Sequence, residues 1–518
     1  MMTIRKQGWS GGGARAAATG LLAGLALLVS CTDLDEEPFS AITPNSFYNN
    51  EEEVRAGVAA VYNSLNSVAT GNYHYVNTIS SDEQVIPTRG QDWYDNGTHL
   101  EAQRQAWTPN SPSGLGTVNG AWNQAFQGIA RANVLLEAIE PLPIADKDVI
   151  VAETRALRAW FYYVLMDLFG GVPIVTETEI APRERASRAE VFNFVEQELL
   201  AVRDVLPVSW PSTDYGRVTR GAVDAMLASL YLNAEVFTGE VTEAGLQRGT
   251  ARWQDAYDAA DRVINGPYAL EEDWFANFRA DNFNSSEIVF VSARAPLTGV
   301  GIDFISDRMH YNMYDPSPFN GRAVEPPTYE KFDDDDLRKS IFLVGPQVHL
   351  VTGAPVNDRS GARLVFTVDF RDITQATEGE GARVYKWPVD PNAELRNHGN
   401  DFPIFRLAEM YLIKAEAANE LGRTAEAIDL INQVRARAFD PDKPLPAGLS
   451  QAQVRDAILD ERLFELMDEA KRRTDLIRHG KWTDPWFEKP QTEPFRVLMP
   501  IPQTQLDANP LLTQNPGY

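Results

Sequence analysis

The sequence is poor in the residues that most often carry chemistry. Its 518 residues include one cysteine and six histidines. A single cysteine allows no disulfide within the chain and no CxxC redox or zinc motif. The histidines, such as His74, His99 and His310, are scattered without metal-ligand spacing, and the sequence contains no HExxH, GxSxG or P-loop motif. We therefore expect a protein that is not an enzyme and has no catalytic residues, no metal and no cofactor.

Positive charge is also scarce. Lys and Arg number 47 against 73 Asp and Glu, so the formal net charge is −26. Nucleic-acid phosphates require a basic surface, and this balance therefore argues against a nucleic-acid partner. It argues equally against a protein that lies flat on an anionic membrane. The charge is compatible with neutral ligands such as sugars, and it keeps the surface soluble by repulsion.

No apolar run is long enough for a confident transmembrane helix, which needs ~20 apolar residues. The one candidate, residues 16–29, follows three basic residues and leads into the string LLVSC, whose last residue is Cys31. A basic region, an apolar region and a small residue before the cut are the parts of a signal peptide. We predict a signal peptide over residues 1–30 and a mature chain that begins at Cys31.

The string around Cys31 resembles the lipobox of bacterial lipoproteins. In such proteins the thiol accepts a diacylglycerol, so the resemblance implies lipidation of Cys31, with palmitate among the acyl chains that anchor the protein. The mature charge would be near −29, because the signal carries three basic residues and no acid. The acidic residues 32–38 predict a flexible tether and resemble a signal for export to the cell surface. The alternative is an ordinary secretory signal followed by an unremarkable cysteine.

Helical periodicity dominates the chain on both sides of an irregular middle. The clearest pattern covers residues 149–169, where apolar positions form a broad stripe that Gly170, Gly171 and Pro173 bring to an end. The same spacing predicts helices over residues 46–67, 122–139, 188–206, 220–237, 405–439 and 451–479. Residues 271–396 are rich in turn signals and predict a loop-rich lobe with short strands at residues 287–291 and 364–368.

Two stretches look like helix-turn-helix repeats of tetratricopeptide type. Residues 408–438 place small residues on two helices that meet at Gly422. Residues 222–234 and 253–264 can form a second pair, split by an inserted loop. Generic paired helices are the alternative explanation of this pattern.

The assembled pieces resemble the SusD/RagB family of outer-membrane lipoproteins, and the match covers most of the chain. Four segments carry the resemblance and occur in the family's order behind the lipobox. They read ETRALRAWFYYVLMDLFGGVPIVTE (153–177), FRLAEMYLIKAEAANELG (405–422), ILDERLFELMDEAKRRTDLIRHG (458–480) and LMPIPQTQLDANPLLTQNPGY (498–518). The expected fold is mostly α and SusD-like, with tetratricopeptide-like repeats and an irregular lobe that contains a few short strands. Beyond the signal, residues 31–270 would form an N-terminal helical region with ligand-facing loops, and residues 271–518 the C-terminal region.

The third segment departs from the family's pattern. Arg473 and Thr474 stand where an aromatic pair is usual, and Ala470 replaces the usual glycine. The charged residues of this segment look structural. On the one helix predicted over residues 451–479 they can make i,i+4 pairs and hold the C-terminal loop; the set is Glu461, Glu465, Glu469, Arg472 and Arg478.

The resemblance implies a specific role. Such proteins lie at the extracellular side of the outer membrane as lids on a TonB-dependent transporter of the SusC type. They bind a polymer fragment, usually a glycan, and deliver it without cleaving it. A peptide-capturing lid of the same kind is one alternative. A surface glycoside hydrolase is another, because a chain with 73 acids leaves a catalytic carboxylate pair open.

Exposed aromatic side chains are the features that sugar binding requires, because sugar rings stack their C–H faces on them while planar polar groups bind the hydroxyls. Residues 81–107 offer this mixture outside a clear helix, in the region where related proteins carry ligand contacts. The candidates there are Asp82, Arg89, Asp92, Trp93, Tyr94 and Asn96. A second cluster over residues 309–314 adds Tyr311 and Tyr314, with Phe319 beside them. Core packing is the competing explanation for each aromatic residue.

The acidic run at residues 333–336 is the one place where sequence alone suggests calcium, which prefers clustered carboxylates. The run lacks the glycine and the spaced oxygen ligands of an EF-hand loop. A solvated helix start ahead of Leu337 explains it better.

Overall fold

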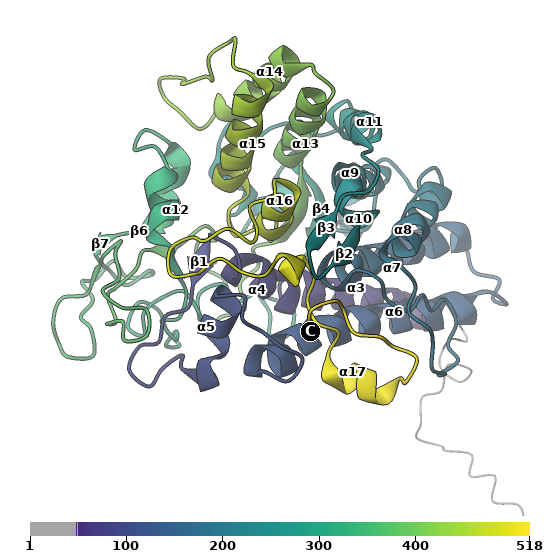
Figure 1. Ribbon diagram of the computed structural model, residues 1–518, viewed down its shortest axis with the longest axis horizontal. Coiled ribbons are helices and arrows are strands. Elements are labelled where there is room, and N and C mark those ends of the chain that lie inside the picture. The colour runs from purple at the N-terminus through teal and green to yellow at the C-terminus, as the bar shows by residue number, and fades with distance from the viewer. Residues whose placement is uncertain (1–47, 49) are drawn as a thin grey trace, which may run out of the picture. The chain divides into compact units, whose positions relative to one another are not determined.

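Helices form the framework of the computed structural model, which describes residue 48 and residues 50–518 (Figure 1). Residues Tyr48–Tyr518 form one compact unit. The predicted signal peptide, Cys31 and the tether at residues 32–38 lie outside the described residues, so they stay predictions, as does the division at residue 270. The mostly α fold class is confirmed. Within the described part of the chain, no helix is both long and apolar enough to span a bilayer.

Four helices of the N-terminal half pack in sequence order. α3 (Glu51–Ala69) lies on α6 (Asn119–Ile139), α6 on α7 (Lys147–Phe169), and α7 on α8 (Arg188–Val202). α7 is buried along nearly its whole length, as the broad apolar stripe predicts. It ends at Gly170, whose φ of 73° is one that L side chains rarely adopt.

The two predicted repeat pairs join into one array. α9 (Arg220–Leu232) packs on α11 (Trp253–Ile264), α11 on α13 (Leu407–Glu420), and α13 on both α14 (Thr424–Arg435) and α15 (Gln451–Leu466). Figure 1 shows these helices side by side. The expected inserted loop between α9 and α11 contains a hairpin of β2 (Glu240–Thr242) and β3 (Gly245–Gln247).

The strands of the irregular lobe pair only two at a time, all antiparallel, in the described residues. The longest pair is β4 (Ile288–Ser292) with β10 (Phe402–Arg406), at the predicted strand of residues 287–291. The others are β1 (Gln84–Val85) with β5 (Ala323–Val324), β6 (Phe342–Leu343) with β9 (Arg383–Val384), and β7 (Gly345–Pro346) with β8 (Val365–Phe366). Side chains and loops, rather than a sheet, must therefore hold this lobe together.

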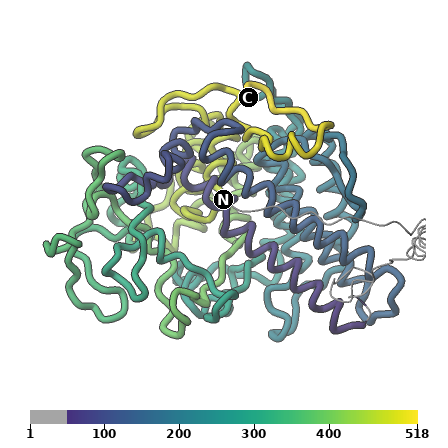
Figure 2. Tube along the Cα trace, turned by 90° about the horizontal axis from the view of Figure 1, so that it is seen from below, coloured from purple at the N-terminus to yellow at the C-terminus, as the bar shows by residue number. Residues whose placement is uncertain are grey.

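Shorter helices complete the chain. They are α4 (Asn72–Ile79), α5 (Thr98–Gln103), α10 (Ala234–Phe237), α12 (Pro326–Lys331), α16 (Arg472–Arg478) and α17 (Gln503–Ala508). The C-terminal segment returns to the first helices (Figure 2). There the Gln505 side chain donates to Asn119 of α6, and Trp107 Nε1 donates to the hydroxyl of Tyr518.

The predicted helix over residues 451–479 is broken, and this corrects the charge pattern expected on it. α15 ends at Leu466 and α16 begins at Arg472; between them Asp468 and Ala470 have φ of 65° and 59°. The expected i,i+4 pairs are wrong, because the charged groups turn to partners far along the chain. Arg472 pairs with Asp82 and Arg478 with Glu416.

The acidic side chains of the same segment meet a buried arginine, and we call this group the Arg406 cluster. Arg406, at the end of β10, contacts Glu287 (2.6 Å), Glu465 (2.9 Å) and Glu469 (2.8 Å), and none of these side chains is exposed by more than 2%. Arg437 adds a second cation against Glu287 and Glu465. The cluster joins the residue before β4, the end of β10, α15 and the break that follows α15.

Candidate functional site

The first predicted segment, residues 81–107, splits into an inner and an outer part. Asp82 faces inward and pairs with Arg472, Nη2 to Oδ2 at 2.8 Å. Arg89 is also buried and donates to the carbonyl oxygens of Thr377 and Glu380. The side chains of Asp82 and Arg89, both predicted to contact a ligand, are therefore already bonded to other parts of the protein. This favours a role for them in supporting the surface loops.

Trp93 is held in place by the second predicted segment. Its indole Nε1 donates to the carbonyl oxygen of Phe319 at 2.6 Å, and its ring meets His99 edge-on. Gly321 lies against the indole, since a Cβ there would be 2.6 Å from a ring atom. The φ of Trp93 is 62°, so the loop holds this side chain in a conformation that tryptophan rarely adopts.

Asp92 and Tyr311 link the two segments directly. The Tyr311 hydroxyl donates to Asp92 Oδ2 at 2.6 Å, and Arg359 Nη2 donates to the same oxygen at 2.9 Å. The Arg359 guanidinium also lies over the Tyr311 ring, 4.2 Å from its centre. Burial, together with the Asp92 carboxylate, raises the pKa of the Tyr311 hydroxyl, so this hydrogen bond persists at neutral pH.

The outer surface of this junction is aromatic. Tyr94, the chain neighbour of Trp93, is 58% exposed, and Phe319, whose carbonyl accepts from the Trp93 indole, is 48% exposed. Asn96 is exposed beside them at a φ of 56°. Arg396 lies 4.8 Å from the centre of the Phe319 ring. We call Trp93, Tyr94, Tyr311 and Phe319 the aromatic platform.

Tyr314 does not join the platform. It is 6% exposed, packs with Met309 and Met313 in a small core, and donates its hydroxyl to the carbonyl oxygen of Leu395 at 2.8 Å. Tyr314 therefore packs in a core, which was the competing explanation for each aromatic candidate. The structure thus brings Asp92, Trp93, Tyr94 and Tyr311 together with Phe319, and leaves Asp82, Arg89 and Tyr314 underneath.

Sequence reasoning missed Arg359 and Arg396, the two guanidinium groups at the platform. Each lies on a loop without helical or strand periodicity, and each meets its aromatic partner across at least 48 residues of sequence. No local signal could have selected these two from the other arginines of the chain. Planar donors beside aromatic rings are nevertheless the groups that sugar hydroxyls need.

Leu395, which neighbours Arg396, has a φ of 58° and an exposure of 64%. The left-handed region costs a non-glycine residue roughly 1–2 kcal/mol, and glycine returns about 0.4–1 kcal/mol of that through its freedom in the unfolded chain. We therefore expect Leu395→Gly to raise the free energy of unfolding by about 0.5–1 kcal/mol in urea titrations. Leu395→Ala keeps the strain and is the control; an alanine variant as stable as the glycine variant would contradict the prediction.

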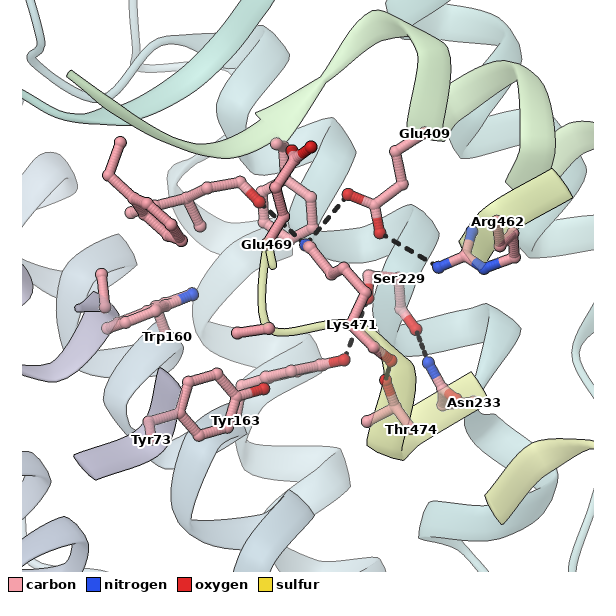
Figure 3. A pocket seen from close by; sticks show the side chains of 15 residues that line it. Tyr73, Trp160, Tyr163, Ser229, Asn233, Glu409, Arg462, Glu469, Lys471 and Thr474 are labelled. Atoms are coloured by element: carbon pink, nitrogen blue, oxygen red, sulfur yellow. Dashed lines mark hydrogen bonds and ion pairs between the residues drawn. The ribbon is translucent and has the colours of Figure 1, made fainter. Parts of the chain in front are cut away.

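A second candidate site, an internal cavity of about 30 Å³, lies beneath the break between α15 and α16 (Figure 3). The Lys471 ammonium enters it and lies 2.9 Å from Glu409, while Tyr163 and Ser229 share a hydrogen bond on the opposite wall. Ligand pockets for small molecules measure about 300–1,000 Å³, whereas a water needs only about 10–15 Å³. This cavity therefore fits water and excludes an oligosaccharide.

The acidic run at residues 333–336 is accounted for by local partners. Asp336 caps the 3-10 turn Leu337–Ile341 and pairs with the buried Arg338 at 2.8 Å, as expected of a helix start, although it is buried rather than solvated. Asp333 contacts Lys443. In the described residues no group of three or more His, Cys, Asp and Glu side chains is arranged to hold a metal ion.

Comparison with known families places both halves of the chain. Residues 34–232 match the family described as "Starch-binding associating with outer membrane", and residues 371–518 match the family described as "SusD family". The two matches flank the irregular lobe that contains Tyr311, Phe319 and Arg359.

Individual proteins extend the similarity over nearly the whole length. SusD-like protein P25 of Formosa agariphila is 25% identical over 94% of this chain and 97% of its own. The starch-binding protein SusD of Bacteroides thetaiotaomicron is 25% identical over 82% of each chain. Surface glycan-binding protein A of Bacteroides thetaiotaomicron, solved in complex with laminarihexaose, superposes with a TM-score of 0.71 over 90% of this chain and 99% of its own, at 21% identity. The four segments quoted from the sequence, the helical array and these matches agree: the chain belongs to the SusD/RagB family.

Proposed function

We propose that this protein captures oligosaccharides or polysaccharide fragments on the aromatic platform and delivers them, without cleaving them, to a SusC-type TonB-dependent transporter. The observation that carries the proposal is the platform itself. Its four aromatic residues include two exposed side chains and an indole fixed by a hydrogen bond, and guanidinium groups lie beside two of the rings. Such a surface suits a neutral sugar polymer, since aromatic faces bind the sugar rings while charged donors bind hydroxyls.

The relatives support the ligand class. One is named for binding starch, and the family description for residues 34–232 mentions starch and the outer membrane. Another was solved with laminarihexaose bound. The transporter partner, the lipid on Cys31 and the extracellular orientation rest on the family resemblance and are part of the proposal.

The direct test is calorimetric titration of the protein from Thr32 to Tyr518 with starch, laminarin, laminarihexaose, further neutral polysaccharides and a set of peptides. Heat from one glycan class supports the proposal and names its ligand. Heat from peptides alone would replace it with peptide capture, and the appearance of shorter products would replace it with a hydrolase. No heat from any of them would count against the platform as a sufficient binding site.

Tyr94→Ala and Trp93→Ala should each weaken binding of the glycan by about 1–3 kcal/mol, because truncating a central aromatic contact of an interface costs this much. Tyr94 is the cleaner position, since its side chain is mostly exposed, whereas Trp93 also fixes the backbone at Phe319. Leu511→Ala, at a side chain 46% exposed outside the platform, is the control. Affinities equal to the control in both variants would remove the platform from the ligand site.

A further inference from the structure

Exposed aromatic side chains occur at two places in the described residues. Four are exposed: Tyr94 and Phe319 on the platform, and Tyr215 (40%) and Phe283 (54%) elsewhere. The second pair is also a cluster, because the two rings meet edge-on with their centres 6.5 Å apart. Neither residue was a candidate from the sequence, and packing in the core does not explain either exposed ring.

The second pair lies between two grooves. One, of about 280 Å³, is lined by Tyr215, Trp210, Tyr268 and the edge of β4. The other, of about 560 Å³, is lined by Phe283, with Arg279, Asp281 and Asn392 as polar groups. Both grooves are open on the surface and of the size that small-ligand sites have, unlike the internal cavity. They combine aromatic faces with planar polar side chains, as the platform does.

Tyr215 is fixed by a buried partner. Its hydroxyl donates to Asp401 Oδ2 at 2.8 Å, and the other oxygen of Asp401 accepts from the backbone N–H of Arg294 at 2.6 Å. Arg217, two residues further on, lies over the Trp210 ring with 3.7 Å between its guanidinium and the ring centre. The rings of this loop are therefore held in place before any ligand arrives, which lowers the entropy that binding must overcome.

One short segment connects the second pair to the platform. Pro391 and Asn392 line the groove of Phe283, while Arg396 lies over the ring of Phe319. Arg396 follows Asn392 by four positions, so their Cα atoms are at most about 14 Å apart. One end of this loop therefore borders the groove of Phe283, and its other end borders the ring of Phe319.

We propose that Tyr215, Phe283 and Trp210 form a second carbohydrate-contacting surface, which continues the platform along residues 391–396 and lets one polysaccharide chain engage both places. The inference rests on the proposed function, because it assumes the same class of ligand. It predicts that the protein binds a polysaccharide more tightly than a short oligosaccharide of the same linkage. Two contacts joined by one ligand raise the apparent affinity through effective concentration, whereas a ligand too short to span them gains nothing.

The test compares polymer and short ligand on the same variants. Gel retardation is measured in starch, in laminarin and in whichever other polysaccharide of the panel binds the wild type most tightly; a trisaccharide of the same linkage is titrated calorimetrically. Tyr215→Ala/Phe283→Ala should bind the polysaccharide about tenfold more weakly and the trisaccharide within about twofold of the wild type. Tyr94→Ala should weaken both.

Two controls separate stacking from folding. Tyr215→Phe removes the hydrogen bond to Asp401 but keeps the ring, and it should retain polysaccharide binding. Phe283→Ala alone decides the outcome if the double variant melts at a lower temperature, because the ring of Phe283 is exposed. Polysaccharide binding by Phe283→Ala within twofold of the wild type would overturn the second surface and leave the proposed function standing. Absence of polysaccharide binding by the wild type would overturn both.

Discussion

Arg406→Met lowers the free energy of unfolding by about 3–5 kcal/mol, the largest effect that we expect from a single charged side chain. The guanidinium is fully buried and faces Glu287, Glu465 and Glu469. Methionine fills a similar volume but removes a cation that contacts all three carboxylates, in a place where water cannot replace it. Glu287 then keeps only Arg437, and Glu469 only Lys386, as a partner among these ion pairs. Arg406→Lys keeps the charge but cannot reach several carboxylates in one plane, so its loss should be intermediate.

Urea unfolding measures this loss, with Arg55→Met as the matched control. Arg55 makes one exposed pair with Glu51 at 2.7 Å on α3, and such pairs contribute about 0.3–0.5 kcal/mol. An Arg406→Met protein no less stable than Arg55→Met would show that the cluster contributes nothing net to folding.

The stability that the Arg406 cluster contributes should depend on pH. Burial alone would raise the pKa of Glu287 and of Glu465, but Arg437 and Arg406 lower both below the usual range. A carboxyl with a lowered folded pKa contributes stability that is present above its unfolded pKa, about 4.3 for Glu, and that is lost as the pH falls towards the folded value. The wild type should therefore lose stability below about pH 4.5, and Arg406→Met should lose less over the same interval. Parallel pH curves for the two proteins would contradict this origin of the effect.

Phe161→Ala should cost about 3–5 kcal/mol, since it empties a fully enclosed space between two long helices. The ring of Phe161, on α7, is not exposed at all, and it covers the backbone of Gly128 on α6. α6 and α7 approach closely at this point because Gly128 has no side chain. Thermal or urea unfolding measures the loss.

Gly128→Ala tests the same contact from the opposite helix. A Cβ at Gly128 would lie 2.6 to 2.8 Å from three atoms of the Phe161 ring, so the substitution should cost about 1–3 kcal/mol. Combining it with Phe161→Leu, which shortens the opposing side chain, should cost less than the two single changes together. Simple additivity would mean that the ring and the glycine do not meet in solution.

The long helices could be predicted from the sequence because their signals are local. The apolar stripe over residues 149–169 and the two glycines after it lie within one segment, and α7 follows them closely. The break at residues 467–471 could not be predicted in the same way. It carries no Gly or Pro, and Asp468 within it accepts hydrogen bonds from the Arg308 guanidinium, 160 residues away, a partner that the local sequence does not reveal.

The candidate site, too, could be predicted from the sequence only in part. Composition pointed to residues 81–107 and 309–314, and the structure joins Asp92 to Tyr311 across 219 residues. Composition could not tell which aromatic side chains would be covered, so Tyr314 was grouped with Tyr311 although it lies in a small core. It also passed over Tyr215 and Phe283, which lie in separate stretches of sequence and become a pair only in the fold.

The return of the C-terminal segment to the first helices has a consequence for how the molecule assembles. Asp82 meets its counter-ion 390 residues later, and Trp107 meets Tyr518 across 411 residues. During synthesis the N-terminal helices therefore emerge long before the groups that neutralise and cover them. Loops of this length close at an entropic cost that slows folding. Residues 472–518 thus complete contacts of a part of the chain made much earlier, and a nascent chain stopped before Arg472 would leave the Asp82 carboxylate without this partner.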